Sequence, residues 1–177
     1  MSLATDVRYL LDRFEIQDKI ALYGLGQDLH QPDSGDNDIL AQWGELFAPD
    51  AEIDCTDVGL SVFSLRAYAE LMRGPGLKGG GLDAPFNVWQ HIEGHATVTI
   101  DGDAATSVAP HLHTHGVRQA EANTFAVGYW HDRWERRAEG WRIVHRRLQQ
   151  LYFHTFPLTR TPNLFDIAFE GMPVEAG

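Results

Sequence analysis

The amino-acid sequence predicts an α+β domain in which helices come first and a long-stranded antiparallel sheet follows. Up to residue 73, apolar residues recur at intervals of three and four, which is typical of amphipathic helices. From Phe86 onward the period changes to two, the signature of strands with one buried face. Turn sequences at 101–103 (Asp-Gly-Asp) and 138–140 (Ala-Glu-Gly) join the later segments into hairpins. Helices followed by paired strands define the α+β class.

Three helices are predicted, at residues 6–29, 38–47 and 64–73. Ser2 or Thr5 can cap the first, because a short side-chain oxygen accepts hydrogen bonds from free backbone N–H groups. A stretch dense in turn-forming residues, 31–37, ends the first helix. The second helix is expected to stop at 48–50, where Pro49 stands.

Five strands are predicted, at residues 51–54, 86–100, 104–117, 125–137 and 141–154. Residues 74–85 contain five glycines and two prolines, so we expect a loop there. Residues 155–177 combine three prolines with an apolar patch, which indicates a lid or a strap onto a neighbouring subunit. The chain is therefore divided into a domain, residues 1–154, and a C-terminal tail, residues 155–177.

Composition excludes several function classes. The 25 acidic side chains outnumber the 14 basic ones, giving a net charge of −11, whereas a nucleic-acid protein needs a basic face. No apolar run is long enough to span a membrane, and no secretory signal opens the chain, so a cytoplasmic protein is expected. The single cysteine, Cys55, cannot form an internal disulfide. The arginines of 133–147 are expected on a solvated or subunit-facing side of the sheet, with Trp134, Trp141 and Leu148 on its outer face.

Five motifs stand in a characteristic order along the chain. They are Leu-Phe-Ala-Pro-Asp-Ala-Glu-Ile-Asp (46–54), Trp-Gln-His-Ile-Glu-Gly-His (89–95), Ile-Asp-Gly-Asp-Ala-Ala-Thr (100–106), Gly-Tyr-Trp-His-Asp (128–132) and Gly-Trp-Arg-Ile-Val-His-Arg-Arg (140–147). With Tyr23 and Asp28 on the helix before them, they resemble the SnoaL-like branch of the nuclear transport factor two superfamily, near scytalone dehydratase and bile acid 7α-dehydratase. The resemblance covers residues 14–151.

This resemblance implies a cone-shaped α+β barrel, in which three N-terminal helices wrap a strongly curved, mostly antiparallel sheet. The open end of such a cone admits an apolar substrate. Members include dehydratases, isomerases, polyketide cyclases and halide-eliminating lyases, so the fold alone does not determine the reaction. No cofactor and no metal are implied.

His91 is the first candidate for catalysis, because a neutral imidazole near pH 7 can abstract a proton. By period two it shares a face with Trp89. A lone histidine is more often a buried group bonded to a carbonyl, but its motif matches the position of the family's catalytic histidine. Asp28 lies near the end of the first helix, where the helix dipole disfavours a carboxylate. It is either a surface acid or, as the resemblance implies, the partner that orients His91.

Tyr23 and three histidines complete the candidate set. Tyr23 can donate to a developing enolate oxygen, or it can be core packing with its hydroxyl at the rim. His111, His113 and His115 alternate on one strand face; a metal site there is disfavoured, because no further ligand stands at a recognisable spacing. The resemblance brings His115 to the position that assists departure of the leaving group, with His113 two residues away.

The chain departs from scytalone dehydratase in the predicted pocket. Cys55 stands where that enzyme has a second tyrosine, and Gly128 and Trp130 stand where it has a serine and an asparagine, which makes scytalone an improbable substrate. A wider, more apolar pocket is expected. The residues predicted to bind substrate are Cys55, Phe63, Met72, Trp89, His113, Tyr129, Trp130 and Phe153.

Together these observations predict a cofactor-independent lyase, most concretely a dehydratase that acts on a cyclic, largely apolar ketone or alcohol. Tyr23, Asp28, His91 and His115 are the expected catalytic residues. An isomerase or polyketide cyclase, in which Asp28 itself shuttles the proton, is the alternative among enzymes. A binding module, like a dioxygenase β-subunit, is the alternative outside them. We expect a homo-oligomer, a trimer or a dimer, with no nucleic-acid or membrane partner.

Overall fold

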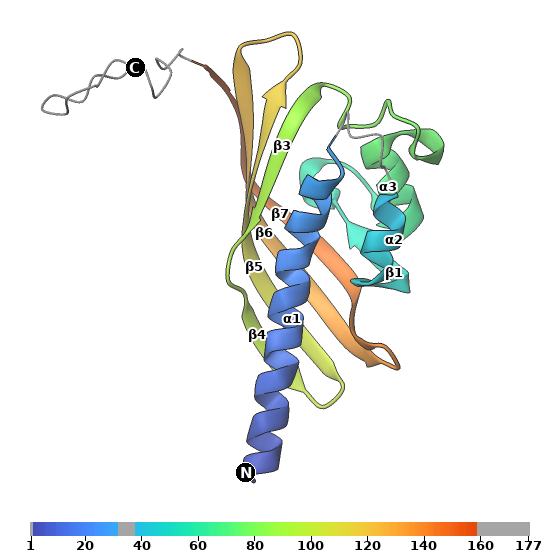
Figure 1. Ribbon diagram of the computed structural model, residues 1–177, viewed down its shortest axis with the longest axis vertical. Helices are drawn as coiled ribbons and strands as arrows, with labels where there is room; N and C mark the ends of the chain where they lie inside the picture. Colours follow the sequence, from blue (N-terminus) through green and yellow to red (C-terminus); the bar gives the residue numbers. More distant parts are fainter. Residues whose placement is uncertain (1, 32–37, 159–177) are drawn as a thin grey trace, which may run out of the picture.

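A computed structural model describes residues 2–31 and 38–158. In this part of the chain, three α-helices pack on a seven-stranded, mostly antiparallel sheet, which confirms the predicted α+β class (Figure 1). The helices are α1 (Leu3–Leu29), α2 (Ile39–Gly44) and α3 (Leu65–Arg73), with short 3-10 turns η1 (Thr56–Val58) and η2 (Pro75–Leu77). The strands are β1 (Phe47–Asp54), β2 (Val62–Ser64), β3 (Phe86–Glu93), β4 (Thr97–Asp101), β5 (Ala104–Val117), β6 (Ala122–Arg137) and β7 (Gly140–Pro157).

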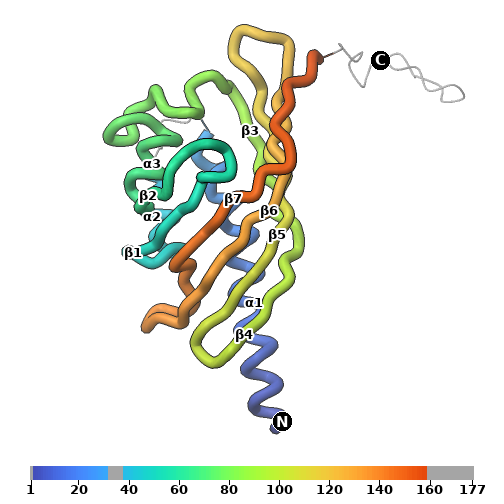
Figure 2. Tube along the Cα trace, turned by 180° about the vertical axis from the view of Figure 1, so that it is seen from behind, coloured from blue at the N-terminus to red at the C-terminus, as the bar shows by residue number. Residues whose placement is uncertain are grey.

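The strand order is β2-β1-β7-β6-β5-β3, with β4 also paired to β5. Only the β1–β7 pair is parallel among these described strands. The two predicted turns join β4 to β5 and β6 to β7, as the hairpin signals indicated. Figures 1 and 2 show α1 along one face of the sheet, with α2 and α3 beside it near β1. The pocket described below lies between the sheet on one side and η1, α3 and the loop after α3 on the other.

Hydrogen bonds from polar side chains connect α1 to the sheet at several points along the helix. The Gln17 amide donates to the Ala96 carbonyl at 2.6 Å and accepts from the Ala96 N–H at 3.1 Å. Nearer the N-terminus, both carboxylate oxygens of Asp12 accept from Arg136 at 2.7 Å. The buried side chains of α1, including Ile16, Ile20 and Tyr23, join the core that fills the space under the sheet. No helix in the described ranges has the length and apolarity needed to cross a bilayer.

Two element boundaries differ from the prediction. The second helix ends at Gly44, and residues 48–50 lie inside β1 instead of stopping a helix. Proline has no backbone N–H to donate. Pro49 is tolerated because the β1–β7 register is interrupted between Phe47 and Glu52, so no sheet hydrogen bond is required from residue 49. The predicted strand 86–100 is divided into β3 and β4 near Gly94, whose N–H bonds to Pro110 across the sheet at 2.8 Å. The short strand β2 was not predicted.

The predicted outer face is wrong for Trp134, Trp141 and Leu148, and the predicted solvated side is wrong for Arg146. Leu148 lines the pocket described below. Trp134 is 1% exposed and Trp141 is fully buried, and Arg146 is also fully buried. Period two explains Trp134, since Asp132 and Trp130 on the same strand are also buried. Strand β7 continues to Pro157, so the segment expected to be a tail begins inside the sheet. Residues 159–177 of that segment lie outside the described residues.

Candidate active site

The end of α1 meets the free edge of β3, and this contact builds a His–Asp pair. The His91 backbone N–H donates to both Asp28 oxygens, at 2.9 and 3.1 Å, and Nδ1 lies 2.8 Å from Oδ1. Because an ionised carboxylate only accepts hydrogen bonds, Nδ1 carries the proton and Nε2 is left as the basic nitrogen. An edge strand also needs partners for its outward N–H groups, and Asp28 supplies one.

Two glutamines extend this contact to Trp89. The Gln31 amide accepts from the Trp89 N–H at 3.0 Å and donates to the Trp89 carbonyl at 2.7 Å, in the manner of a neighbouring strand. The indole N–H of Trp89 donates to the Gln27 carbonyl at 2.9 Å. On its other side, the Trp89 ring lies under the Arg73 guanidinium, 4.4 Å from the ring centroid. The strand that carries His91 is therefore held in position before any ligand binds.

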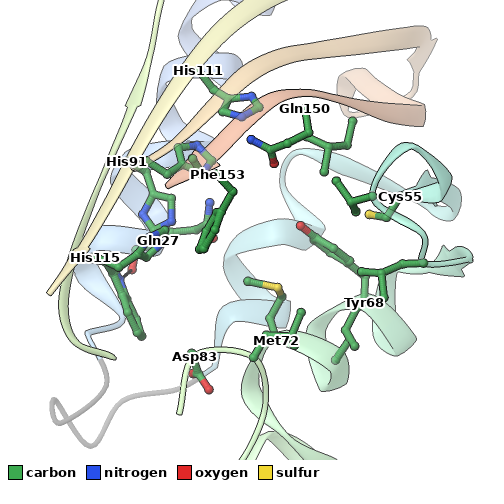
Figure 3. A pocket seen from close by; sticks show the side chains of 18 of the residues that line it. Gln27, Cys55, Tyr68, Met72, Asp83, His91, His111, His115, Gln150 and Phe153 are labelled. Carbon is green, nitrogen blue, oxygen red and sulfur yellow. Dashed lines mark hydrogen bonds between the residues drawn. The ribbon is translucent and has the colours of Figure 1, made fainter. Parts of the chain in front are cut away.

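A cavity of about 280 Å³ opens beside this pair. Figure 3 shows His91, His111 and His115 on one wall, with Cys55 and Tyr68 opposite them and Phe153 between. The remaining surface is largely apolar, with side chains from η1, α3, β7 and the loop after α3. Its apolar lining residues are Val58, Leu60, Leu71, Met72, Leu82, Phe86, Ala126, Leu148 and Phe153. The arrangement suits a ligand with one polar edge and an apolar body.

Most of the predicted site residues lie at this cavity. Those that line it are Tyr23, Cys55, Met72, Trp89, His91, His113, His115, Trp130 and Phe153. Asp28 contacts His91 from behind and does not line the cavity. Phe63 packs against Tyr68 in the core instead, with ring centroids 6.4 Å apart. Tyr129 is 37% exposed on the opposite face of β6, because it adjoins the inward-facing Trp130 and successive residues alternate.

The three histidines of β5 sit in a poorly solvated environment. Burial, followed by the neighbouring His113, lowers the pKa of His111 to about 3, and burial lowers the pKa of His115 to about 4. Burial also holds the pKa of His113 well below its usual range. All three are thus neutral at neutral pH. His115 Nδ1 lies 2.9 Å from Thr124 Oγ1. Residues 2–31 and 38–158 contain no cluster of three or more side chains arranged to hold a metal ion.

Two tyrosines meet in the inner part of the cavity. Burial raises the pKa of Tyr23 to about 12 and that of Tyr68 well above its ordinary value, so both remain protonated phenols. Their hydroxyls lie close enough that each influences the pKa of the other. Tyr68 comes from α3, where its helical spacing from Leu65 and Leu71 already indicated an inward position. Tyr68 thus adds a second phenol to the cavity wall, opposite the histidines.

Sequence reasoning missed two buried ionisable groups behind the cavity, Arg146 and Glu93. Arg146 donates to Asp132 at 2.7 and 2.8 Å, and its guanidinium lies 4.1 Å from the Tyr23 ring centroid. Glu93 lies beside His113, and burial raises its pKa to about 7. The period of two from His91 places Glu93 on the inner face, which was the available signal.

The helices and the curved sheet form a nuclear transport factor two-like fold, and its pocket holds a part-buried His–Asp pair. Residues 8–147 match the SnoaL-like domain model, and the chain belongs to that family.

Solved structures agree with this assignment. An NTF2-like protein with a cystatin-like fold from Novosphingobium aromaticivorans is 33% identical, with a TM-score of 0.60 over 84% of this chain and 88% of that one. The hexachlorocyclohexane dehydrochlorinase LinA-type3 from Novosphingobium barchaimii LL02 is 16% identical, with a TM-score of 0.67 over 88% of this chain and 99% of that one. A candidate scytalone dehydratase from Novosphingobium aromaticivorans DSM 12444 is 15% identical, with a TM-score of 0.64 over 95% and 100%. A search of curated protein sequences finds no match.

Proposed function

We propose that the protein is a cofactor-independent lyase, most concretely a dehydratase that acts on a cyclic, largely apolar ketone or alcohol. The observation that carries this proposal is the 2.8 Å contact between His91 Nδ1 and Asp28, which leaves Nε2 as a base on a largely apolar cavity. Two structural neighbours, a dehydrochlorinase and a candidate scytalone dehydratase, bear names that denote elimination reactions.

Each group has one task in the proposed elimination. His91 Nε2 removes the proton next to the substrate carbonyl, and Asp28 stabilises the resulting imidazolium. The Tyr23 phenol, protonated because of its high pKa, donates to the developing enolate oxygen. A histidine of β5, either His115 or His113, protonates the departing hydroxyl. General acid–base steps of this kind contribute roughly 10²–10⁴-fold each.

The cavity volume supports a substrate of modest size. An apolar cavity of about 150 Å³ holds one benzene ring. The 280 Å³ here is close to twice that volume, which suits a molecule of two fused rings. Its polar wall of histidines faces apolar side chains, so a ketone or hydroxyl group would point toward β3 and β5.

The geometry supports elimination over the two alternatives. An isomerase or cyclase that uses Asp28 to carry the proton needs that carboxylate at the substrate, but Asp28 lies behind the imidazole. A non-catalytic module of the dioxygenase β-subunit kind is expected to fill its pocket with side chains or to turn His91 outward. Here the cavity is open, and His91 lines it.

The test uses 3-hydroxy-1-tetralone, a two-ring β-hydroxy ketone without further polar groups, whose dehydration gives 1-naphthol. The wild type is expected to form the product lighter by one water, and His91→Gln to fall to the uncatalysed rate. His95→Gln, a change of a histidine outside the cavity, is the matched control and should retain activity. Equal turnover by wild type and His91→Gln would overturn the proposal, and so would a product of unchanged mass.

A further inference from the structure

A second carboxyl–imidazole pair lies beside the first one. Glu93 follows His91 by two residues on β3, so both side chains point to the inner face. Its Oε1 lies 2.9 Å from His113 Nε2, and its side chain is only 1% exposed. The other oxygen, Oε2, is buried and has no hydrogen-bond partner among the described residues. A buried carboxylate in this state is costly, so burial favours the protonated form of Glu93.

The two pairs are joined through their imidazoles. His91 and His113 face each other in the β3–β5 register, and their ring centroids are 4.3 Å apart. His113 lines the cavity, whereas Glu93 lies behind it, just as Asp28 lies behind His91. Because Glu93 occupies Nε2 of His113, the other ring nitrogen, Nδ1, is the one left for a ligand.

We propose that His113, backed by Glu93, is the acid that protonates the departing hydroxyl, with Glu93 as the positioning residue that resupplies the proton through Nε2. This inference rests on the proposed elimination and chooses between the two β5 histidines left open above. His115 differs because its Nδ1 is bonded to a threonine hydroxyl and its ring stacks on Phe86, with centroids 4.5 Å apart.

The charges around the pair favour this arrangement. Burial raises the pKa of Glu93 to about 7, while Arg146 on β7, His111 on β5 and His91 act in the opposite direction. Asp132 on β6 raises it further. Burial, together with His91, His115 and Arg146, holds the pKa of His113 well below normal, so the imidazolium form is disfavoured. Below pH about 7 the proton therefore resides on Glu93, which donates to Nε2 and leaves the Nδ1–H tautomer of His113.

The proposed step balances in atoms and electrons. His91 Nε2 takes the substrate C–H proton, the electron pair of that bond forms the new C=C bond, and the C–O bond breaks. The leaving oxygen takes the Nδ1 proton of His113 and departs as water. At the same time the Glu93 proton moves to Nε2 of His113. The site resets when the His91 imidazolium returns its proton to the second pair.

The kinetic test compares wild type with Glu93→Gln on 3-hydroxy-1-tetralone across pH. Glutamine keeps the shape and can still donate to Nε2, but it has no proton to give. We expect kcat to fall by roughly 10²-fold with KM nearly unchanged, since Glu93 does not line the cavity. The wild-type decline of kcat above pH about 7 should disappear in the variant. Asp12→Asn, another buried carboxylate far from the cavity, should change neither kcat nor its pH profile.

Unchanged kcat in Glu93→Gln, or an unchanged pH profile, would overturn the inference. A measurement without substrate separates this failure from failure of the proposed function. Nitrogen-15 NMR of the histidines should show His113 protonated on Nδ1 at pH 5.5 and on Nε2 at pH 8.5, because an ionised Glu93 becomes an acceptor. In Glu93→Gln this tautomer change should be absent. A His113 tautomer that is insensitive to pH in the wild type would refute the inference even if dehydration is observed.

Discussion

Gly24 lies against the backbone of His91. A Cβ atom at this position would come within 2.9 Å of the His91 carbonyl oxygen and 3.0 Å of Glu93 Cγ. The helix end can therefore approach β3 closely enough for Asp28 to reach the imidazole only because residue 24 has no side chain. A glycine inside a helix ordinarily costs about 1 kcal/mol relative to alanine, so its presence here reflects this packing.

Gly24→Ala should therefore lower activity and stability together, despite the better helix propensity of alanine. Overpacking of this kind typically costs 1–3 kcal/mol, and it would push β3 away from Asp28. We expect a lower melting temperature and at least a tenfold loss of kcat/KM, since small misplacements of catalytic groups are costly. Gly44→Ala, where nothing lies within 4 Å of the added Cβ, is the matched control. A Gly24→Ala variant as active and stable as Gly44→Ala would contradict this explanation.

Asp28→Asn separates the two tasks of Asp28. The amide oxygen can still accept the His91 backbone N–H, so the edge of β3 keeps one partner and stability should change little. The charge that stabilises the imidazolium is lost, and the amide N–H₂ can impose the wrong tautomer on Nδ1. We expect kcat to fall by roughly 10²–10⁴-fold, in line with carboxylate-to-amide changes in other catalytic His–Asp pairs.

Kinetics and thermal melting on the same preparations check this prediction. Asp18→Asn, an exposed carboxylate on the same helix, should leave both measurements unchanged. Full activity in Asp28→Asn would mean that Asp28 serves only the edge of the sheet.

The regular elements follow from local pattern, and the missed features do not. Three features depend only on residues near each other in sequence. They are the hairpins, the face shared by Trp89 and His91, and the inward-facing side chains of α3. The break of the strand near Gly94 and the pairing of Glu93 with His113 arise from contacts across the sheet, which no local period shows. The motif at 128–132 predicts Tyr129 in the pocket, but alternation with the inward-facing Trp130 puts it on the opposite face.

Glu93 should make stability depend on pH in an unusual direction. Its pKa rises on folding, from an ordinary 4.5 to about 7, so the folded state binds the proton more tightly. The stability that this proton contributes is fully present below pH 4.5 and is lost as pH rises through about 7. The difference corresponds to roughly 3 kcal/mol. Glu93→Gln, which cannot ionise, should thus raise the melting temperature at pH 8.5 and have little effect at pH 4.5. An equal change in melting temperature at both pH values would show that ionisation of Glu93 does not destabilise the fold.

The buried Arg146–Asp132 ion pair predicts that Arg146→Met lowers stability and that a second substitution, Asp132→Asn, recovers part of the loss. Both side chains are fully buried, and two hydrogen bonds of 2.7 and 2.8 Å join them. Arg146→Met leaves the Asp132 carboxylate without its partner, and removing one member of a buried ion pair typically costs 3–5 kcal/mol. It also removes the guanidinium from beneath the rings of Tyr23 and Trp130.

Adding Asp132→Asn to Arg146→Met should recover part of that loss, because an amide costs less to bury than an unpaired charge. Urea unfolding of both single variants and the double variant measures the coupling between the two positions. We expect the double variant to be more stable than Arg146→Met by at least about 1 kcal/mol. If the losses of unfolding free energy in the two single variants simply add up in the double variant, each side chain is stabilised by its other neighbours. The ion pair itself would then contribute little to stability.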